Sequence, residues 1–586
     1  MHPHSKKVSH SYSQPKFVKP CQAKEYVGNV VKKNLVLSQD EPYYVHNLNN
    51  ALVGDTIKFI ITHPAEANKN PVIQVTSVVK RGRMYYLATV VSSNTKIAVK
   101  IFGNDYEFPL PSDLQRFSKG SRHLDTFSNV DHLEWVKSLD IYSNDEIIRY
   151  CFQCEDNLCD EPIVESQTEE TLDQKDLYTI TVDPIQSKDF DDAISIDPKN
   201  NKIMIHIADV SAFVKPGSKL DIRLYLAQFS TYCNNKTYHM CPESLATDKC
   251  SLLPGVERSA ATVELSYDPD TLMILYKKTK HYKSKIISKR RFHYEEVDDI
   301  LQSYSTTNEY EALLLLKRIF MTNAFVKRFS EHQPKISKVI DGQIIFEKQT
   351  KDDSHAIIEF YMLFANQYVA FTLRKQNKSF PKRVHPPPKH PEKIEEIRNM
   401  TLPPHCPEEF RAFLLLRCLP SAYYSAIDNG HYALGMDDYT HFTSPIRRYV
   451  DIINHRCLFD KTVQYSQKDM EAICKKANEM EQRSRAIDEM KSYLQNIDIA
   501  REWKQANKKL QCIICSMFVA GFNVFVIELG ITLPIFISDI SSVWGEFFKL
   551  DTTTQEWKAK TKVIRLYELV TCRIKAAVDK IELEIL

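Results

Sequence analysis

The sequence predicts a multidomain protein in which small β-barrels flank a central α+β domain. The chain has 586 residues, enough for about three to five domains of typical size. Both ends alternate apolar and polar residues over short segments, whereas the middle mixes such segments with long helical patterns. The predicted parts are a disordered tail at 1–23, one or two barrels at 24–165, the α+β domain at 177–505 and a final barrel at 508–586.

The N-terminal barrels are predicted from short strand-like segments separated by turn residues, such as GDTIKFIITH, NPVIQVTSVV and RMYYLATVV. Strands of this length and spacing suit barrels of the OB type. The acidic stretch at 155–176 follows and is predicted to be a linker. The whole region to residue 165 is expected to be all-β.

A cluster of cations and aromatic rings lies near residue 80, formed by Lys80, Arg81, Arg83 and Tyr85. Bases of a single-stranded nucleic acid stack on rings while cations follow its phosphates, so these residues are candidates for RNA binding. A strand that ends in a solvated basic turn is the simpler explanation of these residues taken alone.

The central domain is predicted from strands such as KIMIHIADVSAFV and from four helical stretches. These stretches are EYEALLLLKRIFMTNAFVKRF, AIIEFYMLFANQYVAFTLRK, SPIRRYVDIINHRCLF and KDMEAICKKANEMEQRSRAIDEMKSYLQ. After residue 508 strand patterns return in LQCIICSMFVAGFNVFVIEL and WKAKTKVIRLYELVTCRIKAAV, which predicts a C-terminal OB-type barrel.

Composition and charge say more about the compartment of the protein than about its function. The net charge of +2 predicts no partner, so a nucleic-acid surface must arise from local clustering. No apolar run approaches the roughly 18 residues that span a bilayer, and the N-terminus lacks a secretory signal. We therefore expect an intracellular protein, with the cytoplasm as the best match and the mitochondrion and nucleus left open.

The 14 cysteines of a chain without a secretory signal are expected to be free thiols. Cys151, Cys154 and Cys159 have the spacing of metal ligands but lack a fourth ligand nearby. Cys512 and Cys515 lie in an alternating segment that is typical of a buried strand, so core packing is the expected role.

Four aspartates occur within ten residues of a segment with apolar flanks: ITVDPIQSKDFDDAISID contains Asp183, Asp189, Asp191 and Asp192. Like charges this close repel, so a buried cluster requires a cation. Oxygen ligands without His or Cys select Mg²⁺, or Mn²⁺, and suit attack on a phosphodiester. A loop after the strand that holds Asp183 would let all four side chains converge. An exposed Asp-rich turn that binds Ca²⁺, or nothing, is the alternative.

A second candidate site lies in HFTSPIRRYVDIINHR, at residues 441–456. Ser444 and Pro445 fit the N-cap and first position of a helix, which places Arg447 and Arg448 in its first turn. Exposed N–H groups and two guanidinium groups at a helix start form a phosphate clamp. Pairing of the arginines with Asp451 is the alternative.

These segments together resemble a known catalytic domain. VDPIQSKDFDDAISI, IHIADVSAFVKPGSKLD, MCPESLATDKCSLLPGVER and YTHFTSPIRRYVDIINHR occur in the order found in the RNB domain of ribonuclease II, ribonuclease R and the exosome catalytic subunit. The resemblance covers about residues 180–460. The flanking regions resemble the family in arrangement, with cold-shock-type barrels before the RNB domain and an RNA-binding barrel after it.

The resemblance implies a processive 3′→5′ exoribonuclease that hydrolyses single-stranded RNA to nucleoside 5′-monophosphates by two-metal-ion chemistry with Mg²⁺. The four aspartates fall on the family's metal-binding positions, and Asp191 on the one most closely tied to catalysis. Arg447 matches the arginine that stabilises the transition state, while Arg448 and Ser444 are expected RNA contacts. Tyr232 matches the tyrosine that stacks on terminal bases, although core packing also explains it. His455 is expected to be structural.

Some features depart from the family pattern or leave alternatives open. Glu359 is followed by Phe360 where two adjacent acids are usual, and no second aromatic residue for the base clamp can be placed. A catalytically inactive RNB protein that binds RNA or acts as a scaffold is the alternative function. The expected partner is single-stranded RNA, and no association with a membrane is expected. The protein is either a monomer or part of an RNA-degradation assembly such as an exosome or a helicase complex.

Overall fold

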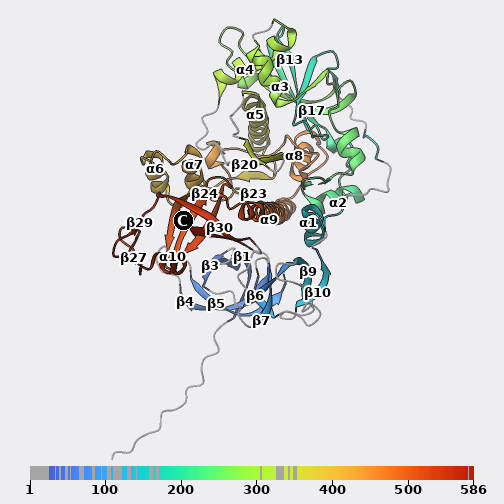
Figure 1. Cartoon of the computed structure of the whole chain (residues 1–586). Helices are drawn as coiled ribbons and strands as arrows, with labels where there is room; N and C mark the ends of the chain where they lie inside the picture. The colour runs from blue at the N-terminus through green and yellow to red at the C-terminus, as the bar shows by residue number, and fades with distance from the viewer. Residues whose placement is uncertain are drawn as a thin grey trace, which may run out of the picture. The chain divides into compact units, whose positions relative to one another are not determined.

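The chain divides into two compact units, Met1–Tyr142 and Ser143–Leu586. The structure is a computed structural model. It describes residues 25–32, 35–38, 41–46, 51–52, 55–64, 71–81, 86–93, 96–101, 107–109, 122–127, 133–139, 142–156, 163–166, 171–303, 306–324, 335–340, 343–347, 353–577 and 580–586. The elements named below carry the same labels in Figure 1.

The first unit contains a closed five-stranded barrel and a separate five-stranded sheet. The barrel has the order β1-β2-β3-β5-β4, with β3 and β5 parallel and the other pairs antiparallel. Its strands are β1 (Tyr26–Lys32), β2 (Leu35–Ser38), β3 (Glu41–Val45), β4 (Thr56–His63) and β5 (Val72–Lys80). Alternate residues face its core, which includes Val30, Ile57 and Phe59.

The second sheet of this unit has the order β10-β9-β6-β7-β8 and is antiparallel. Its strands are β6 (Tyr86–Ser93), β7 (Lys96–Ile101), β8 (Glu107–Pro109), β9 (Arg122–Phe127) and β10 (Leu133–Ser138). The prediction that the chain is all-β to residue 165 is wrong at α1 (Asn144–Phe152), which begins the second unit. Ser143 and Glu146 form a capping box there, and Ile147, Ile148 and Cys151 share its buried face.

The second unit is built on a seven-stranded sheet of order β11-β18-β17-β14-β13-β12-β19. Its strands are β11 (Thr171–Asp173), β12 (Tyr178–Val182), β13 (Asp192–Asp197), β14 (Lys202–Ala208), β17 (Glu257–Ser266), β18 (Lys280–Ile287) and β19 (Arg290–Phe292). The pairs β11–β18 and β12–β19 are parallel and the other pairs are antiparallel. Strand β14 is buried at nearly every position, as expected for a sheet covered on both faces.

A row of polar side chains crosses this sheet in its interior. Hydroxyl and imidazole groups are linked in sequence from β12 to β18 by hydrogen bonds of 2.5–2.8 Å, through Thr179, Ser195, His206, Thr262 and Ser284. Burial lowers the pKa of His206 to about 3, so the ring is neutral. The row satisfies groups that would otherwise be costly to bury.

Helices cover the sheet and form the rest of the unit. They are α2 (Lys219–Ala227), α3 (Tyr294–Gln302), α4 (Asn308–Asn323), α5 (Asp353–Lys375), α6 (Pro391–Asn399), α7 (Glu408–Leu416), α8 (Tyr449–Phe459) and α9 (Gln467–Gln505). Helices α3, α4 and α5 pack together next to the sheet (Figure 1). Among the described helices, α5 is long and apolar enough to span a membrane, but 61% of its apolar window is buried inside the protein.

Short two-stranded antiparallel sheets complete the central domain. They are β15 (Thr231–Tyr232) with β16 (Thr237–Tyr238), β20 (Lys335–Ile340) with β21 (Gln343–Glu347), and β22 (Lys382–Val384) with β23 (Tyr423–Ser425).

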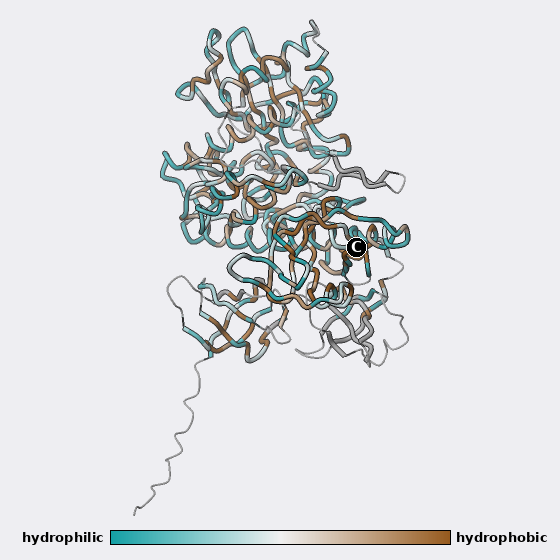
Figure 2. The backbone as a smooth tube through the Cα atoms, turned by 60° about the vertical axis from the view of Figure 1, so that its left-hand side comes forward, coloured by the Kyte–Doolittle hydropathy of each residue, from teal (hydrophilic) through white to brown (hydrophobic). Residues whose placement is uncertain are grey.

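The C-terminal part is a five-stranded antiparallel sheet of order β26-β25-β24-β30-β31, joined to the central domain by α9. Its strands are β24 (Lys509–Phe518), β25 (Gly521–Val526), β26 (Ile531–Phe536), β30 (Leu569–Ala577) and β31 (Ile581–Ile585). Helix α10 (Ile537–Trp544) and the small sheet of β27 (Lys549–Asp551), β28 (Glu556–Lys558) and β29 (Val563–Ile564) lie between β26 and β30 in sequence. Apolar stretches run along these strands (Figure 2), and Ala500 and Trp503 of α9 pack into the same core.

Helix α8 is anchored to α2 through one buried carboxylate. Asp221 of α2 accepts hydrogen bonds from the Tyr449 hydroxyl at 3.0 Å, the Arg456 guanidinium at 2.9 Å and the Gly217 N–H at 2.7 Å. Asp221 and Arg456 are both buried. This contact fixes the position of the segment that precedes α8.

We predict that Asp221→Ala lowers the free energy of unfolding by about 3–5 kcal/mol, because it leaves the buried Arg456 guanidinium without a counter-charge. Denaturant unfolding followed by fluorescence measures the change. Asp270→Ala, in an exposed turn, is the matched control and is expected to change it by less than about 0.5 kcal/mol. Equal effects of the two substitutions would contradict the assigned role of the contact.

Candidate active site

Asp183, Asp189 and Asp191 lie on the loop that joins β12 to β13, and Asp192 is the first residue of β13. Strand β12 ends at Val182, directly before Asp183, and β13 begins at Asp192. These strands are antiparallel neighbours, so the two carboxylates come from the same end of adjacent strands. Asp183 and Asp191 are buried, whereas Asp189 and Asp192 are partly exposed. The loop expected from the spacing of the aspartates is therefore present.

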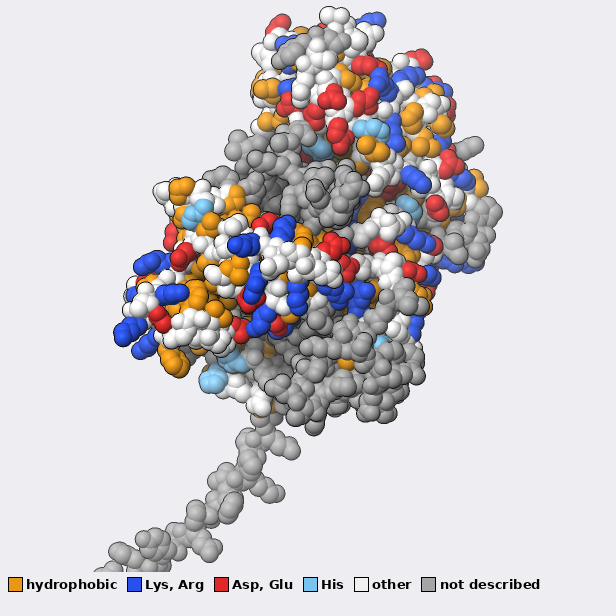
Figure 3. Space-filling view, viewed as in Figure 1, with side chains coloured by type: hydrophobic (Ala, Val, Ile, Leu, Met, Phe, Trp, Pro, Cys, Tyr) orange, Lys and Arg blue, Asp and Glu red, His pale blue; other side chains and the backbone are white. Residues whose placement is uncertain are grey.

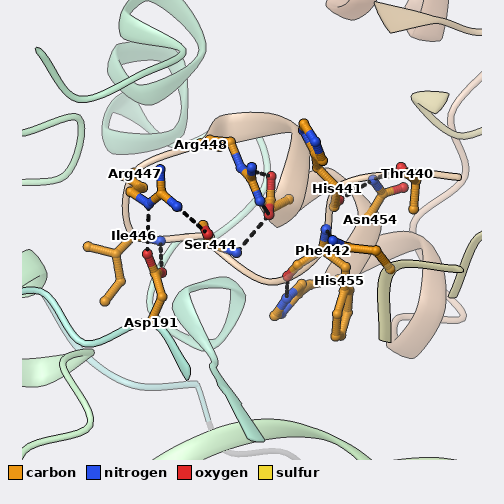
Figure 4. Close-up of polar contacts among 12 residues, drawn as sticks. Asp191, Thr440, His441, Phe442, Ser444, Ile446, Arg447, Arg448, Asn454 and His455 are labelled. Atoms are coloured by element: carbon orange, nitrogen blue, oxygen red, sulfur yellow. Dashed lines mark hydrogen bonds and ion pairs between the residues drawn. The ribbon is translucent and has the colours of Figure 1, made fainter. Parts of the chain in front are cut away.

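Asp191 connects this loop to the segment before α8. Its Oδ1 accepts a hydrogen bond of 2.8 Å from the Ile446 N–H, and its Oδ2 lies 3.4 Å from Nε of Arg447. Figure 4 shows the backbone nitrogen of Ile446 and the guanidinium of Arg447 both directed toward the Asp191 carboxylate. Residues 255 positions apart in sequence thus form one site.

The segment 444–448 is a turn rather than the first turn of a helix. The prediction that Ser444 caps the helix is wrong, because α8 begins at Tyr449 with Arg448 as its N-cap residue. The Ser444 carbonyl accepts from the N–H groups of Arg447 and Arg448, at 3.3 and 3.0 Å, which closes the turn. Asp451 instead reaches back from α8 and accepts the Ser444 N–H at 2.8 Å.

The two arginines have different environments. Asp451 binds Arg448 through two hydrogen bonds of 2.8 and 3.0 Å, which is the pairing that the sequence left as an alternative. The Arg447 side chain is 44% exposed and donates from Nη2 to the Ser444 hydroxyl at 2.9 Å. Arg447 therefore keeps N–H groups available for an anion, whereas the Arg448 fork is already engaged.

Buried polar groups of α8 hold residues 440–442, which directly precede this turn. The Asn454 amide of α8 donates to the Thr440 hydroxyl and to the His441 carbonyl, each at 2.8 Å. His455 is fully buried, hydrogen-bonds the Phe442 carbonyl at 2.9 Å and stacks on the Phe442 ring (Figure 4). Such contacts on both sides of Phe442 make the turn a rigid part of the site.

Tyr232, on the β15–β16 hairpin, contacts the same site. Its hydroxyl donates to Oδ2 of Asp189 at 3.0 Å, and the side chain is 41% exposed. Burial of the hydroxyl and the charge of Asp189 raise the pKa of Tyr232. The phenol is therefore protonated at neutral pH and leaves part of its surface open.

The crowded carboxylates are difficult to ionise in the absence of a cation. Burial, followed by the charge of Asp192, raises the pKa of Asp183 to about 8. Burial also raises the pKa of Asp192 to about 6, and that of Asp191 well above its usual value although Arg447 opposes the shift. Oδ2 of Asp183 is buried with no hydrogen-bond partner.

These donors fit a hard divalent cation by their chemistry. All are carboxylate oxygens, one of them unsatisfied, in a place where negative charge needs compensation. Within the part of the chain that the structure describes, however, no three carboxylate, imidazole or thiol groups are close enough to hold an ion together. Besides burial, the charges of Asp192 and Asp189 both contribute to the raised pKa values of Asp183 and Asp191, so the four carboxylates lie near one another, and their role as metal ligands stays a prediction.

The structure adds Tyr294, which the sequence analysis did not identify. This first residue of α3 is close enough to Asp192 and Asp183 for their charges to raise its pKa, after burial, which is the larger cause. Its ring stacks on His355 of α5 with centroids 3.8 Å apart. Phe360, which departs from the family pattern, is buried in the core, whereas Glu359 is exposed. The available signal for Tyr294 was its place two residues after β19, a strand that ends beside β12.

The predicted RNA-binding cluster belongs to the first unit and is only partly described. Arg83, Tyr85 and the side chain of Lys80 lie outside the described residues. Nη1 of Arg81 pairs with the buried carboxylate of Asp55 at 2.7 Å. Their role in RNA binding therefore stays a prediction. Of the proposed cysteine ligands, Cys159 also lies outside the described residues, while Cys151 and Cys154 are buried free thiols.

Comparison with known proteins identifies similar sequences and folds. The family model described as the RNB domain matches residues 172–462. Ribonuclease R of Chlamydia pneumoniae is 33% identical over 327 residues, which cover 49% of this chain and 47% of that protein. The chain therefore spans about half the length of the curated relatives that match it first.

Two solved structures share the fold. The apo form of Mycoplasma genitalium RNase R has a TM-score of 0.78 at 22% identity, covering 96% of this chain and 100% of that one. Yeast Ssd1, described as a pseudonuclease, has a TM-score of 0.68 at 16% identity, covering 91% of this chain and 81% of that one. The chain thus has a multidomain fold similar to that of RNase R.

We predict that the metal-free protein loses stability as the pH rises from 6 to 8. The folded pKa of Asp183, about 8, is above its unfolded value, so the folded state holds a proton in this window that the unfolded state has released. Asp183→Asn should reduce this loss, to which Asp191 and Asp192 also contribute, and melt about 2–4 °C higher than the unmutated protein at pH 8. Added Mg²⁺ should raise the melting temperature of the unmutated protein more at pH 8 than at pH 6. Parallel pH curves for the two proteins would refute the prediction.

Proposed function

Because the chain belongs to the RNB-domain family, we propose that it is a 3′→5′ exoribonuclease that hydrolyses single-stranded RNA processively to nucleoside 5′-monophosphates. One observation carries the proposal: the Asp191 carboxylate is tied to the turn that presents Arg447. A carboxylate cluster that needs cations and an available guanidinium therefore face the same space. A phosphodiester carries the charge that both groups would bind.

Arg447 would bind and stabilise the phosphate that is cut. Nε is directed to Asp191 and Nη2 to Ser444, so the guanidinium is held in place while further N–H groups remain available. Negative charge increases on the phosphate oxygens as water attacks, and a preorganised donor lowers the barrier without reorganising. Ser444 acts by positioning Arg447, and Arg448 by fixing the turn through Asp451.

Asp183, Asp189, Asp191 and Asp192 would hold divalent cations, Mg²⁺ with Mn²⁺ as a substitute. Such ions supply charge neutralisation and acidify the attacking water in two-metal hydrolysis. The carboxylates alone do not complete an ion's coordination, so the remaining ligands would come from water and the RNA phosphate, as is usual for Mg²⁺. Substrate binding and assembly of the cation site are thereby linked.

The rest of the chain would guide a single strand toward this site. The half-exposed ring of Tyr232, anchored by Asp189, offers a surface on which a terminal base can stack. We propose that the β-structures on either side are cold-shock-type and OB-type RNA-binding modules. Lys and Arg side chains gather on the C-terminal part over β27–β29 (Figure 3), including Lys549, Lys560 and Lys562. This surface suits a phosphate backbone.

The second candidate is a catalytically inactive RNB protein that binds RNA or serves as a scaffold. The fold alone does not exclude it, since Ssd1 shares that fold and is described as a pseudonuclease. All four aspartates and Arg447 are present in this chain, which favours the enzyme. We further propose an intracellular protein, cytoplasmic in the first instance, that acts as a monomer or within an RNA-degradation assembly.

The function is tested with single-stranded RNA labelled at its 5′ end, in Mg²⁺. We expect a ladder that shortens from the 3′ end to a small labelled core, and no reaction on DNA of the same sequence. Asp191→Asn should bind the RNA but degrade it at least about 10³-fold more slowly, because a ligand to the cations is lost. Binding without degradation by the unmutated protein, in either Mg²⁺ or Mn²⁺, would establish the inactive alternative.

Arg447→Lys should lower kcat by about 10²–10³-fold while KM for RNA changes little, since the planar fork acts mainly in the transition state. Single-turnover rates at saturating enzyme measure the chemical step. Arg485→Lys, on α9 in an exposed ion pair with Glu481, is the matched control and should leave kcat unchanged. A rise in KM with unchanged kcat would show that Arg447 serves only in RNA binding.

A further inference from the structure

One arginine of β19 binds the loop that carries the aspartates but is not part of the carboxylate cluster. Nη2 of Arg291 donates to the carbonyl oxygens of Pro184, Ile185 and Ser187, at 2.7, 2.9 and 3.3 Å. These three residues lie between Asp183 and Asp189. The guanidinium therefore binds three backbone carbonyls in the part of the chain between β12 and β13.

The same guanidinium also packs on the far end of the loop. Its central carbon lies 4.6 Å from the centroid of the Phe190 ring, in cation–π geometry. Phe190 is buried, and its N–H donates to the Ser251 hydroxyl at 3.0 Å. The Ser251 hydroxyl in turn donates to the Lys188 carbonyl at 2.9 Å. Arg291 thus contacts both halves of the loop, 184–187 and Phe190.

A loop of this kind is unstable without such a support. Four carboxylates within ten residues repel one another, and repulsion between them favours an extended, open loop. Arg291 opposes this twice, because it brings a positive charge next to the cluster and hydrogen-bonds the backbone itself. A lysine could supply the charge. It lacks the planar guanidinium, which stacks on a ring with its face and donates hydrogen bonds from its edge.

We infer that Arg291 is a positioning residue that holds the aspartate loop in its cation-binding form before cations or RNA arrive. The inference rests on the proposed function for its purpose, since it names the group that prepares that site. Arg291 hydrogen-bonds backbone carbonyls and packs on a ring, and it supplies no metal ligand, so we infer that it acts on cation affinity through the loop. Removing it should weaken binding of divalent cations without removing any ligand.

The chain provides a matched control in the preceding residue. Arg290 lies on the same strand, stacks on Phe292 with its central carbon 4.4 Å from the ring centroid, and pairs with Glu296 and Glu309. None of these partners belongs to the aspartate loop. Arg290→Gln therefore removes an arginine with comparable packing and charge from the same strand while leaving that loop untouched.

The test measures Mn²⁺ affinity by electron paramagnetic resonance titration of the full-length protein without RNA. Arg291→Gln is expected to weaken Mn²⁺ binding about 10- to 100-fold, the range found when groups that orient metal ligands are lost. Arg291→Lys should lie between Arg291→Gln and the unmutated protein, and Arg290→Gln should match the unmutated protein. Hydrogen exchange of the amides of residues 185–191 should accelerate in Arg291→Gln but not in Arg290→Gln.

Activity provides a second readout. In Arg291→Gln, kcat at low Mn²⁺ should fall and then recover at high Mn²⁺ concentration, because the ligands themselves are intact. Unchanged Mn²⁺ affinity in Arg291→Gln and Arg291→Lys would overturn the inference. So would equal losses in Arg291→Gln and Arg290→Gln, which would show a general effect on β19.

The two proposals fail in different ways. If the unmutated protein binds Mn²⁺ with an affinity that depends on Arg291 but does not cut RNA, the proposed function is wrong and the positioning role stands. If the unmutated protein binds no Mn²⁺, the positioning role is overturned.

Discussion

The contact between the Asp191 carboxylate and the Ile446–Arg447 turn is the interaction on which the rest of the site depends. It joins the loop between β12 and β13 of the central sheet to the segment that precedes α8, although the partners are 255 positions apart in sequence. Each side has its own support: the turn is held by Asp451, Asn454 and the buried His455, and α8 is anchored to α2 through Asp221. Much of the second unit thus serves to keep one hydrogen bond and one ion pair in place.

The electrostatics of the site favour the binding of cations. Burial raises the pKa values of Asp183, Asp191 and Asp192, and the charges of neighbouring aspartates add to the rise for Asp183 and Asp191, which means that the protein alone does not stabilise their charged forms. The site therefore lowers the stability of the metal-free protein near neutral pH, and a bound cation would recover it. Such a cost is retained only where the charge has a use, and clustered carboxylates opposite a guanidinium have one in phosphodiester hydrolysis.

Much of the fold and of the candidate site could be predicted from sequence where a local signal exists. The aspartate spacing indicated a loop after a strand, and helical periodicity located α4, α5 and α9. The start of α8 was misplaced because Ser-Pro is a typical helix start, whereas here Asp451 binds the Ser444 N–H from within the helix and makes the segment a separate turn. The contact of Arg447 with Asp191, and the contacts of Arg291 with the aspartate loop, depend on tertiary neighbours that no local pattern encodes.

The central claim is that the aspartates bind cations at the point where Arg447 meets a phosphate. Anomalous diffraction from crystals of the Asp191→Asn variant, grown with Mn²⁺ and a short single-stranded RNA, tests it most directly. The account predicts Mn²⁺ peaks at the carboxylates of Asp183 and Asp192, with the last phosphodiester of the RNA 3′ end within hydrogen-bond distance of the Arg447 guanidinium. Mn²⁺ elsewhere in the chain, or an RNA 3′ end held away from Arg447, would contradict it.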